Sequence, residues 1–139
     1  MTKMRELSVS IPRGFADVAA FLAQPLNYPR WASGLAAGMR RPAAHEEGAG
    51  DPCVWYVQAP QGESRVRFSP ANASGVADHW VKLPDGQEVH IPLRVSPDGR
   101  RSVVTLTLLR QPDVDDARFE ADVQWVQRDL AALKRALDA

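Results

Sequence analysis

The chain has 139 residues, of which 45% are hydrophobic and 24% charged, a composition typical of one ordinary soluble domain spanning residues 1–139. Seventeen Lys and Arg balance seventeen Asp and Glu, so no net field attracts nucleic acid or anionic lipid, and we expect no nucleic-acid partner. The single Cys53 excludes an intrachain disulfide and a thiolate metal site, and with no membrane span or secretory signal at the start, a cytoplasmic location is expected.

The N-terminal segment predicts one strand followed by two short helices. Apolar and polar residues alternate over 7–11, the period of a half-buried strand, and Pro12 ends the pattern. Apolar side chains then recur at helical spacing over 14–23 until Pro25 stops the helix. A further turn or two of helix is expected over 26–34.

The middle of the chain is rich in strand signals. A weak edge strand is expected near Met39, followed by a loop rich in structure breakers. Five longer strand-like segments follow it, at 53–58, 64–69, 76–83, 88–95 and 101–110.

Three connections between these strands repeat a proline followed two residues later by glycine, at 59–62, 83–86 and 96–99. Proline presets the first corner of a type I turn and glycine accepts the left-handed position after it, which predicts a three-residue hairpin loop with a bulge. The result is an antiparallel meander. Because the loop sets the register, it also decides which side chains share a face of the sheet.

This rule assigns faces to the three hairpins. In the Pro84 hairpin, an apolar face containing His79 opposes a face with Trp80 and His90. In the Pro60 hairpin, the rule places Val54, Tyr56, Gln58, Ser64, Val66 and Phe68 on the concave face, and Trp55, Val57, Arg65 and Arg67 on the convex face. In the Pro97 hairpin, the rule would turn Val104, Leu106 and Leu108 towards water, so we expect a different loop there.

A long amphipathic helix is expected at the C-terminal end. Asp113, Asp115 and Asp116 suit its start, and Lys134 and Arg135 suit its end. Its apolar stripe steps by four and three residues and contains Phe119, Val123, Val126, Leu130, Leu133 and Leu137.

Two segments carry a family resemblance. IPRGFADVAAFL at 11–22 with QPLNYPRW at 24–31 resembles the opening of the START-like, or SRPBCC, superfamily, although Gln24 replaces the usual acid. FEADVQWVQRDLAALKRAL at 119–137 resembles the closing helix of this group, which includes polyketide cyclase/dehydrase and lipid transport proteins. The resemblance implies an α+β helix-grip fold, in which a curved antiparallel sheet wraps around the last helix and leaves a hydrophobic cavity. It implies neither a reaction nor a cofactor.

His79 and Tyr56 are the polar residues expected on the concave face that could contact a ligand. His79 is the only ionisable group among apolar neighbours in its hairpin, so it must bond to protein, water or ligand, and its pKa should fall. It is therefore either a structural histidine satisfied by a backbone carbonyl or by Tyr56, a ligand contact, or an acid–base catalyst. No metal site is expected, because His79 and His90 point to opposite faces.

Three functional hypotheses follow. The first is a carrier or sensor that binds a small hydrophobic or aromatic molecule between the sheet and the last helix, with contacts from Tyr56, Phe68, His79, Ile91, Leu106, Phe119, Val123 and Val126. The second is an aromatase/cyclase-like enzyme in which His79 and Tyr56 move protons on a polyketide-type substrate. The third is an interaction module, such as a homodimer, that uses a convex face carrying Trp55 and Trp80. The ligand's identity, and whether side chains fill the cavity, stay open at this point.

Overall fold

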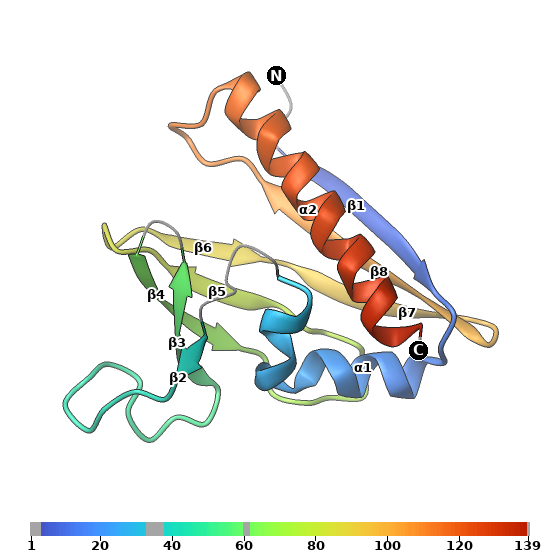
Figure 1. The fold of residues 1–139 in the computed structure, drawn as a ribbon, viewed down its shortest axis with the longest axis horizontal. Coiled ribbons are helices and arrows are strands. Elements are labelled where there is room, and N and C mark those ends of the chain that lie inside the picture. Colours follow the sequence, from blue (N-terminus) through green and yellow to red (C-terminus); the bar gives the residue numbers. More distant parts are fainter. Residues whose placement is uncertain (1–3, 33–37, 60–61, 139) are drawn as a thin grey trace.

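A computed structural model describes residues 4–32, 38–59 and 62–138 (Figure 1). The elements follow the order expected from the sequence, except that the single strand predicted over 88–95 is two strands, at 88–91 and 93–98. The second helix is a short 3-10 helix (η1), and positions 33 and 34 of its predicted range lie outside the described residues. The elements are β1 (Met4–Ile11), α1 (Phe15–Ala23), η1 (Pro25–Arg30), β2 (Met39–Arg40), β3 (Val54–Ala59), β4 (Gly62–Phe68), β5 (His79–Lys82), β6 (Glu88–Ile91), β7 (Leu93–Asp98), β8 (Arg101–Leu109) and α2 (Asp116–Leu137).

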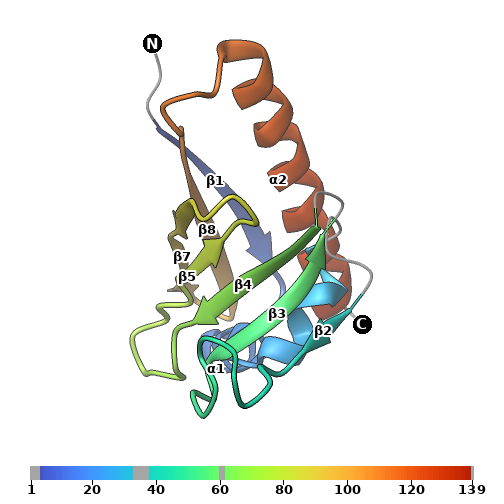
Figure 2. The ribbon, with the colours of Figure 1, turned by 90° about the vertical axis from the view of Figure 1, so that its left-hand side faces the viewer.

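The strands form two antiparallel sheets, ordered β2-β3-β4-β5-β6 and β1-β8-β7. The segment from Glu88 to Asp98 supplies a strand to each sheet, and Pro92 separates the two because proline has no N–H to donate. At this junction Thr107 N–H donates to the Pro92 carbonyl oxygen over 2.9 Å, which joins β8 to the end of β6. With α2 lying along β1 and β8, this is the predicted α+β helix-grip architecture (Figures 1 and 2).

The register of the Pro84 hairpin is the predicted one. His79 pairs with Ile91, and Val81 pairs with Val89. Gly86, at φ +90°, occupies the left-handed position of the loop, where glycine carries no Cβ penalty. We call the face that carries His79, Val81 and Val89 the inner face, and the opposite one the outer face.

The Pro97 hairpin confirms that burial decides its register. Val95 pairs with Val104, and Leu93 pairs with Leu106, so the buried side chains of β7 and β8 share one face. Asp98 pairs with Arg101, which leaves a two-residue loop in place of the three-residue loop that the turn pattern favours.

The predicted register of the Pro60 hairpin is wrong by one residue. Ala59 pairs with Gly62, so two residues separate the strands instead of three; Pro60 and Gln61 themselves lie outside the described residues. A shift of one residue moves side chains to the other face of the sheet. Trp55 and Val57 therefore share the inner face with Val66 and Ser64, whereas Val54, Tyr56 and Gln58 lie on the outer face.

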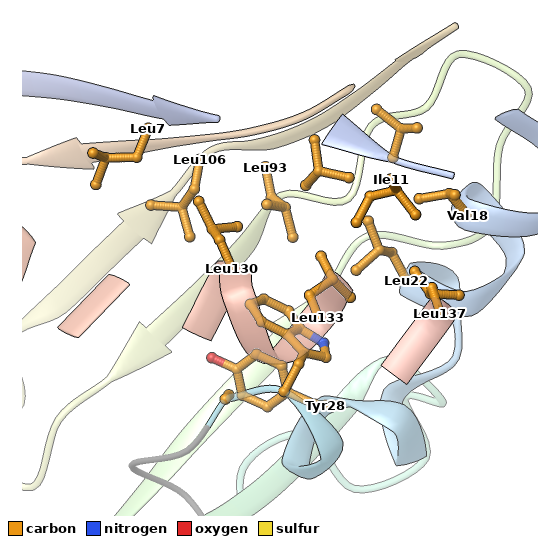
Figure 3. Packing of buried hydrophobic residues seen from close by; sticks show 14 of the residues in the cluster. Leu7, Ile11, Val18, Leu22, Tyr28, Leu93, Leu106, Leu130, Leu133 and Leu137 are labelled. Atoms are coloured by element: carbon orange, nitrogen blue, oxygen red, sulfur yellow. The ribbon is translucent and has the colours of Figure 1, made fainter. Parts of the chain in front are cut away.

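Helix α2 has the predicted caps and stripe. The Asp115 side chain accepts a hydrogen bond from the Arg118 N–H over 2.8 Å and so satisfies one free donor of the first turn. Its buried stripe packs on a core formed with β1, β7, β8, α1 and η1 (Figure 3). The buried members of the stripe are Phe119, Val123, Leu130, Leu133 and Leu137, and Val126 is partly buried.

Candidate functional site

His79 lies on the inner face of β5 with 2% of its surface exposed. Its Nδ1 lies 3.3 Å from the Ala77 carbonyl oxygen, and its Nε2 lies 3.1 Å from the Tyr28 hydroxyl. A carbonyl can only accept, so we assign the proton to Nδ1, and Nε2 then accepts from the Tyr28 O–H. Burial lowers the pKa of His79 from 6.5 to about 4, as expected from the sequence. The imidazole is therefore neutral at pH 7, and both of its nitrogens are engaged.

Tyr28, on η1, supplies the partner that sequence reasoning missed. Burial, with a smaller contribution from the negative charge of Asp129, raises the pKa of Tyr28 well above its ordinary value, so the hydroxyl keeps its proton. The ring of Tyr28 packs edge-on against Trp31, Phe68 and His79, with centroid distances of 5.4, 5.1 and 5.1 Å. Tyr28 and Trp31 were visible at helical spacing, but the spacing alone gives no contact between η1 and β5.

The space beside His79 is almost filled. The cavity that His79 lines with Tyr28, Trp31 and Phe68 has a volume of about 10 Å³. This is room for about one water molecule at most. Of the predicted ligand contacts, Phe68 and His79 line this small cavity, and Leu106 and Val123 are buried elsewhere in the core.

Tyr56 does not join His79. Because of the corrected register, it lies on the outer face, where the Arg40 guanidinium stands 4.6 Å from its ring centroid and its hydroxyl donates to the Glu47 carbonyl oxygen over 3.2 Å. The predicted position of Tyr56 on the concave face is therefore wrong. The structure does not assemble the His79–Tyr56 pair that the cyclase hypothesis required.

Trp55 and Trp80 do not share a surface either. Trp55 lies on the inner face opposite Val66, whereas Trp80 lies on the outer face opposite Arg67. The predicted convex face with two tryptophans is wrong, and with it the proposed homodimer surface. Neither indole is among the large exposed hydrophobic side chains of the described residues, which are Met4, Leu26 and Trp125.

Trp80 belongs to a charged cluster on the outer face. Its ring stacks on His90 at 5.0 Å, with the Arg67 guanidinium 4.5 Å from its centroid. His90 Nε2 lies 3.0 Å from Oδ2 of the buried Asp78, and Arg94 binds both carboxylate oxygens at 2.8 and 2.9 Å.

Asp78 connects the start of β5 to β6 and β7 through hydrogen bonds on the outer face. Burial opposes its charge, but hydrogen bonds from Arg94, the Leu93 N–H and His90 outweigh burial and hold the pKa of Asp78 well below its ordinary value. Within the described residues, no group of three His, Cys, Asp or Glu side chains is placed to hold a metal ion.

A larger cavity, of about 510 Å³, lies at the other end of α2. It is lined by the Pro84 hairpin, the end of β8 and the first turns of α2, and we call it the hairpin cavity. Its apolar lining comes from Leu83, Val89, Leu108, Leu109, Val114 and Phe119. Pockets for small molecules typically have volumes of about 300–1,000 Å³, so this cavity has the size of a ligand site, with one apolar part and a lining that is otherwise polar.

Polar side chains also line the hairpin cavity. Gln87 Nε2 donates to Gln111 Oε1 over 3.1 Å, and Arg118 pairs with Asp122 at 3.3 Å. Arg110 has only 8% of its side chain exposed; its Nη1 lies 2.6 Å from Asp116 Oδ1. These groups can orient the polar end of a ligand whose body lies against the apolar wall.

Solved structures share this fold. A START superfamily protein from Mycobacterium smegmatis superposes with a TM-score of 0.72 at 12% identity, covering 97% of this chain and 97% of that one. The Aha1 dimer from Colwellia psychrerythraea gives 0.66 at 15% identity, with 99% and 96% covered. The di-domain ARO/CYC BexL from the BE-7585A biosynthetic pathway gives 0.69 at 18% identity, with 96% of this chain and 46% of that one covered.

These likenesses define the class: the chain has the START-like helix-grip fold that its terminal segments resemble. No family model matches the sequence, and no curated protein matches it. Among the described residues, no helix is both long enough and apolar enough to cross a membrane.

Proposed function

We propose that this protein binds a small, mainly apolar or aromatic molecule in the hairpin cavity and acts as a carrier or sensor in the cytoplasm. The observation that carries the proposal is the cavity of about 510 Å³ between the sheet and α2, at a place where apolar strand residues face Phe119 of the helix. The proposed apolar contacts are Leu83, Val89, Leu108 and Phe119. Phe119 is the one that the sequence had already singled out.

Partial burial of Leu108, which lines the hairpin cavity, supports this location. Like Val81, Ile91 and Val126, which are not part of the lining, Leu108 packs against the core yet keeps part of its surface exposed. In a closed core such side chains would be covered on all sides. A bound apolar molecule would remove the remaining surface from water, at about 25 cal/mol per Å² of apolar area.

Co-purification and a fluorescent probe test the proposal together. Native mass spectrometry of freshly purified protein should show a mass above that of the chain alone. The probe 1-anilinonaphthalene-8-sulfonate should bind the protein after mild removal of that molecule, with increased fluorescence. Absence of both signals would contradict the proposal.

A matched pair of variants locates the site. Leu108→Trp fills the cavity from the inner face of β8 and should lower probe affinity by about tenfold or more, because the added ring occupies the binding volume. Thr107→Trp adds the same ring one residue earlier, on the opposite face, and should keep the affinity. If both variants, folded by circular dichroism, bind the probe as tightly as the parent protein, the probe does not use this cavity.

A further inference from the structure

Two of the sheet edges, those of β2 and β1, are protected to different extents. At one edge, β2 has only two residues and is followed directly by Arg41 and Pro42, which discourage another strand from adding there. At the other edge, β1 has eight residues, and within the described residues it pairs only with β8. Its stretch from Leu7 to Ile11 contains neither a charge nor a proline. The β1 edge therefore offers unpaired backbone N–H and C=O groups, the usual template for strand addition.

A groove runs beside this edge, between β1 and α2. Its volume is about 380 Å³, and its apolar walls come from Leu7 and Val9 on the strand and from Leu130 and Ala131 on the helix. Ser8 also lines the groove although its side chain points to the opposite face of the strand from Leu7 and Val9, which places the groove at the edge itself.

Contacts near both ends of β1 connect this part of the chain to α2, and the groove lies between them. At one end, Arg5 Nη1 lies 3.5 Å from Glu120 Oε2. At the other end, Arg13 Nε donates to the Leu137 carbonyl oxygen over 2.8 Å. Figure 1 shows α2 lying along the length of β1 between these two ends.

The charge at the groove is positive. Lys134 and Arg135 line it, and neither forms an ion pair with another described residue. No Asp or Glu side chain is among the described residues that line it. A binding segment with carboxylates at this position would gain electrostatic complementarity.

We propose that the β1 edge binds an extended, acidic peptide segment of another protein by strand addition. Backbone hydrogen bonds would pair the segment with β1. Its side chains on the face towards α2 would include apolar ones that fill the groove and carboxylates that meet Lys134 and Arg135. A second copy of this chain fits less well, because its own β1 carries one Arg and one Glu and so brings no net negative charge. This site is separate from the hairpin cavity.

Nuclear magnetic resonance with designed peptides tests the proposal. The probe is an eight-residue peptide, capped at both ends, in which every second residue is threonine and the residues between are two valines followed by two glutamates, so that valine and glutamate share one face. It is titrated into the ¹⁵N-labelled full chain. We expect shifts of amide resonances concentrated in β1 and in residues 127–135 of α2. The same peptide N-methylated at alternate residues cannot pair its backbone and should give no such shifts. Shifts confined to the hairpin cavity, or equal binding of the N-methylated peptide, would overturn the proposal.

Charge reversal separates the site from nonspecific binding. Arg135→Glu should weaken binding of the glutamate peptide by about threefold to tenfold and favour a peptide with lysine in place of glutamate. Arg100→Glu makes the same charge reversal at the exposed β7–β8 loop and should leave binding of the glutamate peptide unchanged. Equal effects of the two variants would contradict the assignment, and so would concentration-dependent self-association of the parent chain that blocks the peptide.

Discussion

The interior of this protein has two ends that differ in how completely they are filled. At the end near α1 and η1, the cavity beside His79 has a volume of only about 10 Å³. At the end near the Pro84 hairpin, a cavity of about 510 Å³ separates the sheet from the first turns of α2. The same hairpin, β5–β6, contributes inner-face residues to both ends.

The helices, not the strands, create this difference. On the inner face of β5 and β6, the pair of His79 and Ile91 is followed directly by the pair of Val81 and Val89. Tyr28 of η1 and Trp31, the C-cap residue of η1, pack beside His79 of the first pair and fill the space there. Val89 of the second pair lines the hairpin cavity instead. In this chain the Tyr28–His79 contact thus closes one end of the interior, and the other end stays unfilled.

The largest predicted effect is a difference between the stability cost of a substitution at the closed end and that of one at the open end. Leu133 of α2 has no exposed surface and lies near Tyr28 in the closed end (Figure 3). Leu133→Ala should lower the free energy of unfolding by about 2–5 kcal/mol, because a cavity remains in a packed core. Val89→Ala, at the open end, should cost less than about 1 kcal/mol. Chemical denaturation measures both; equal losses would mean that the two ends are packed alike.

The second effect is the pH dependence caused by His79. Its pKa in the folded protein, about 4, lies below its ordinary value of 6.5. Between these values the unfolded chain binds the proton more tightly, so the free energy of unfolding should fall as the pH drops from about 6.5 to about 4, by roughly 3 kcal/mol in total. His79→Gln should remove this part of the slope in urea titrations across that range. An unchanged slope would show that the imidazole is not buried as a neutral group.

The third effect tests the outer face behind the hairpin. Asp78→Asn should cost about 2 kcal/mol, because charge-assisted hydrogen bonds from Arg94 and the Leu93 N–H are weakened. The pKa of Asp78 is lowered by folding, so this contribution is present above its ordinary value of 3.8 and is lost as the pH falls below it. Asp98→Asn, at an exposed position, should stay within about 0.5 kcal/mol in the same denaturation experiment. Similar costs for both variants would contradict the role of the cluster.

The smallest effect has the opposite sign. Ser64 is buried on the inner face, and its hydroxyl has no hydrogen-bond partner within the described part of the chain. Ser64→Ala should leave stability unchanged or raise it by about 1 kcal/mol, because an unsatisfied polar group is removed. Ser102 is also buried, but its hydroxyl donates to the Arg13 carbonyl oxygen over 2.8 Å, so Ser102→Ala should lose about 1 kcal/mol. The thermal unfolding temperature should therefore stay the same or rise in Ser64→Ala and fall in Ser102→Ala.

The sequence predicts the helices and strands and the buried face of most strands, but it does not predict where the cavity lies. Periodicity locates α1, α2 and β1, because burial of one face dictates those patterns. Turn chemistry gives the right register at Pro84 and the wrong one at Pro60. There the strands are separated by two residues instead of three, which reverses the faces of β3 and leaves those of β4 as predicted.

The candidate site depends on contacts that no local pattern contains. The fall in the pKa of His79 follows from its neighbours in the hairpin, yet its partner Tyr28 comes from a segment 51 residues away. The packing of Tyr28 and Trp31 decides that the space beside His79 closes. The hairpin cavity is lined by two segments that are separated in sequence, 83–89 and 108–122, so only the folded chain identifies it.

The most direct test is to record nuclear Overhauser effects between 1-anilinonaphthalene-8-sulfonate and the methyl groups of the labelled protein. The account predicts effects to the methyls of Leu83, Val89 and Leu108 around the hairpin cavity. Effects to Leu22 and Leu93 beside His79 in their place would contradict it, because the end described as closed would then be the one that binds.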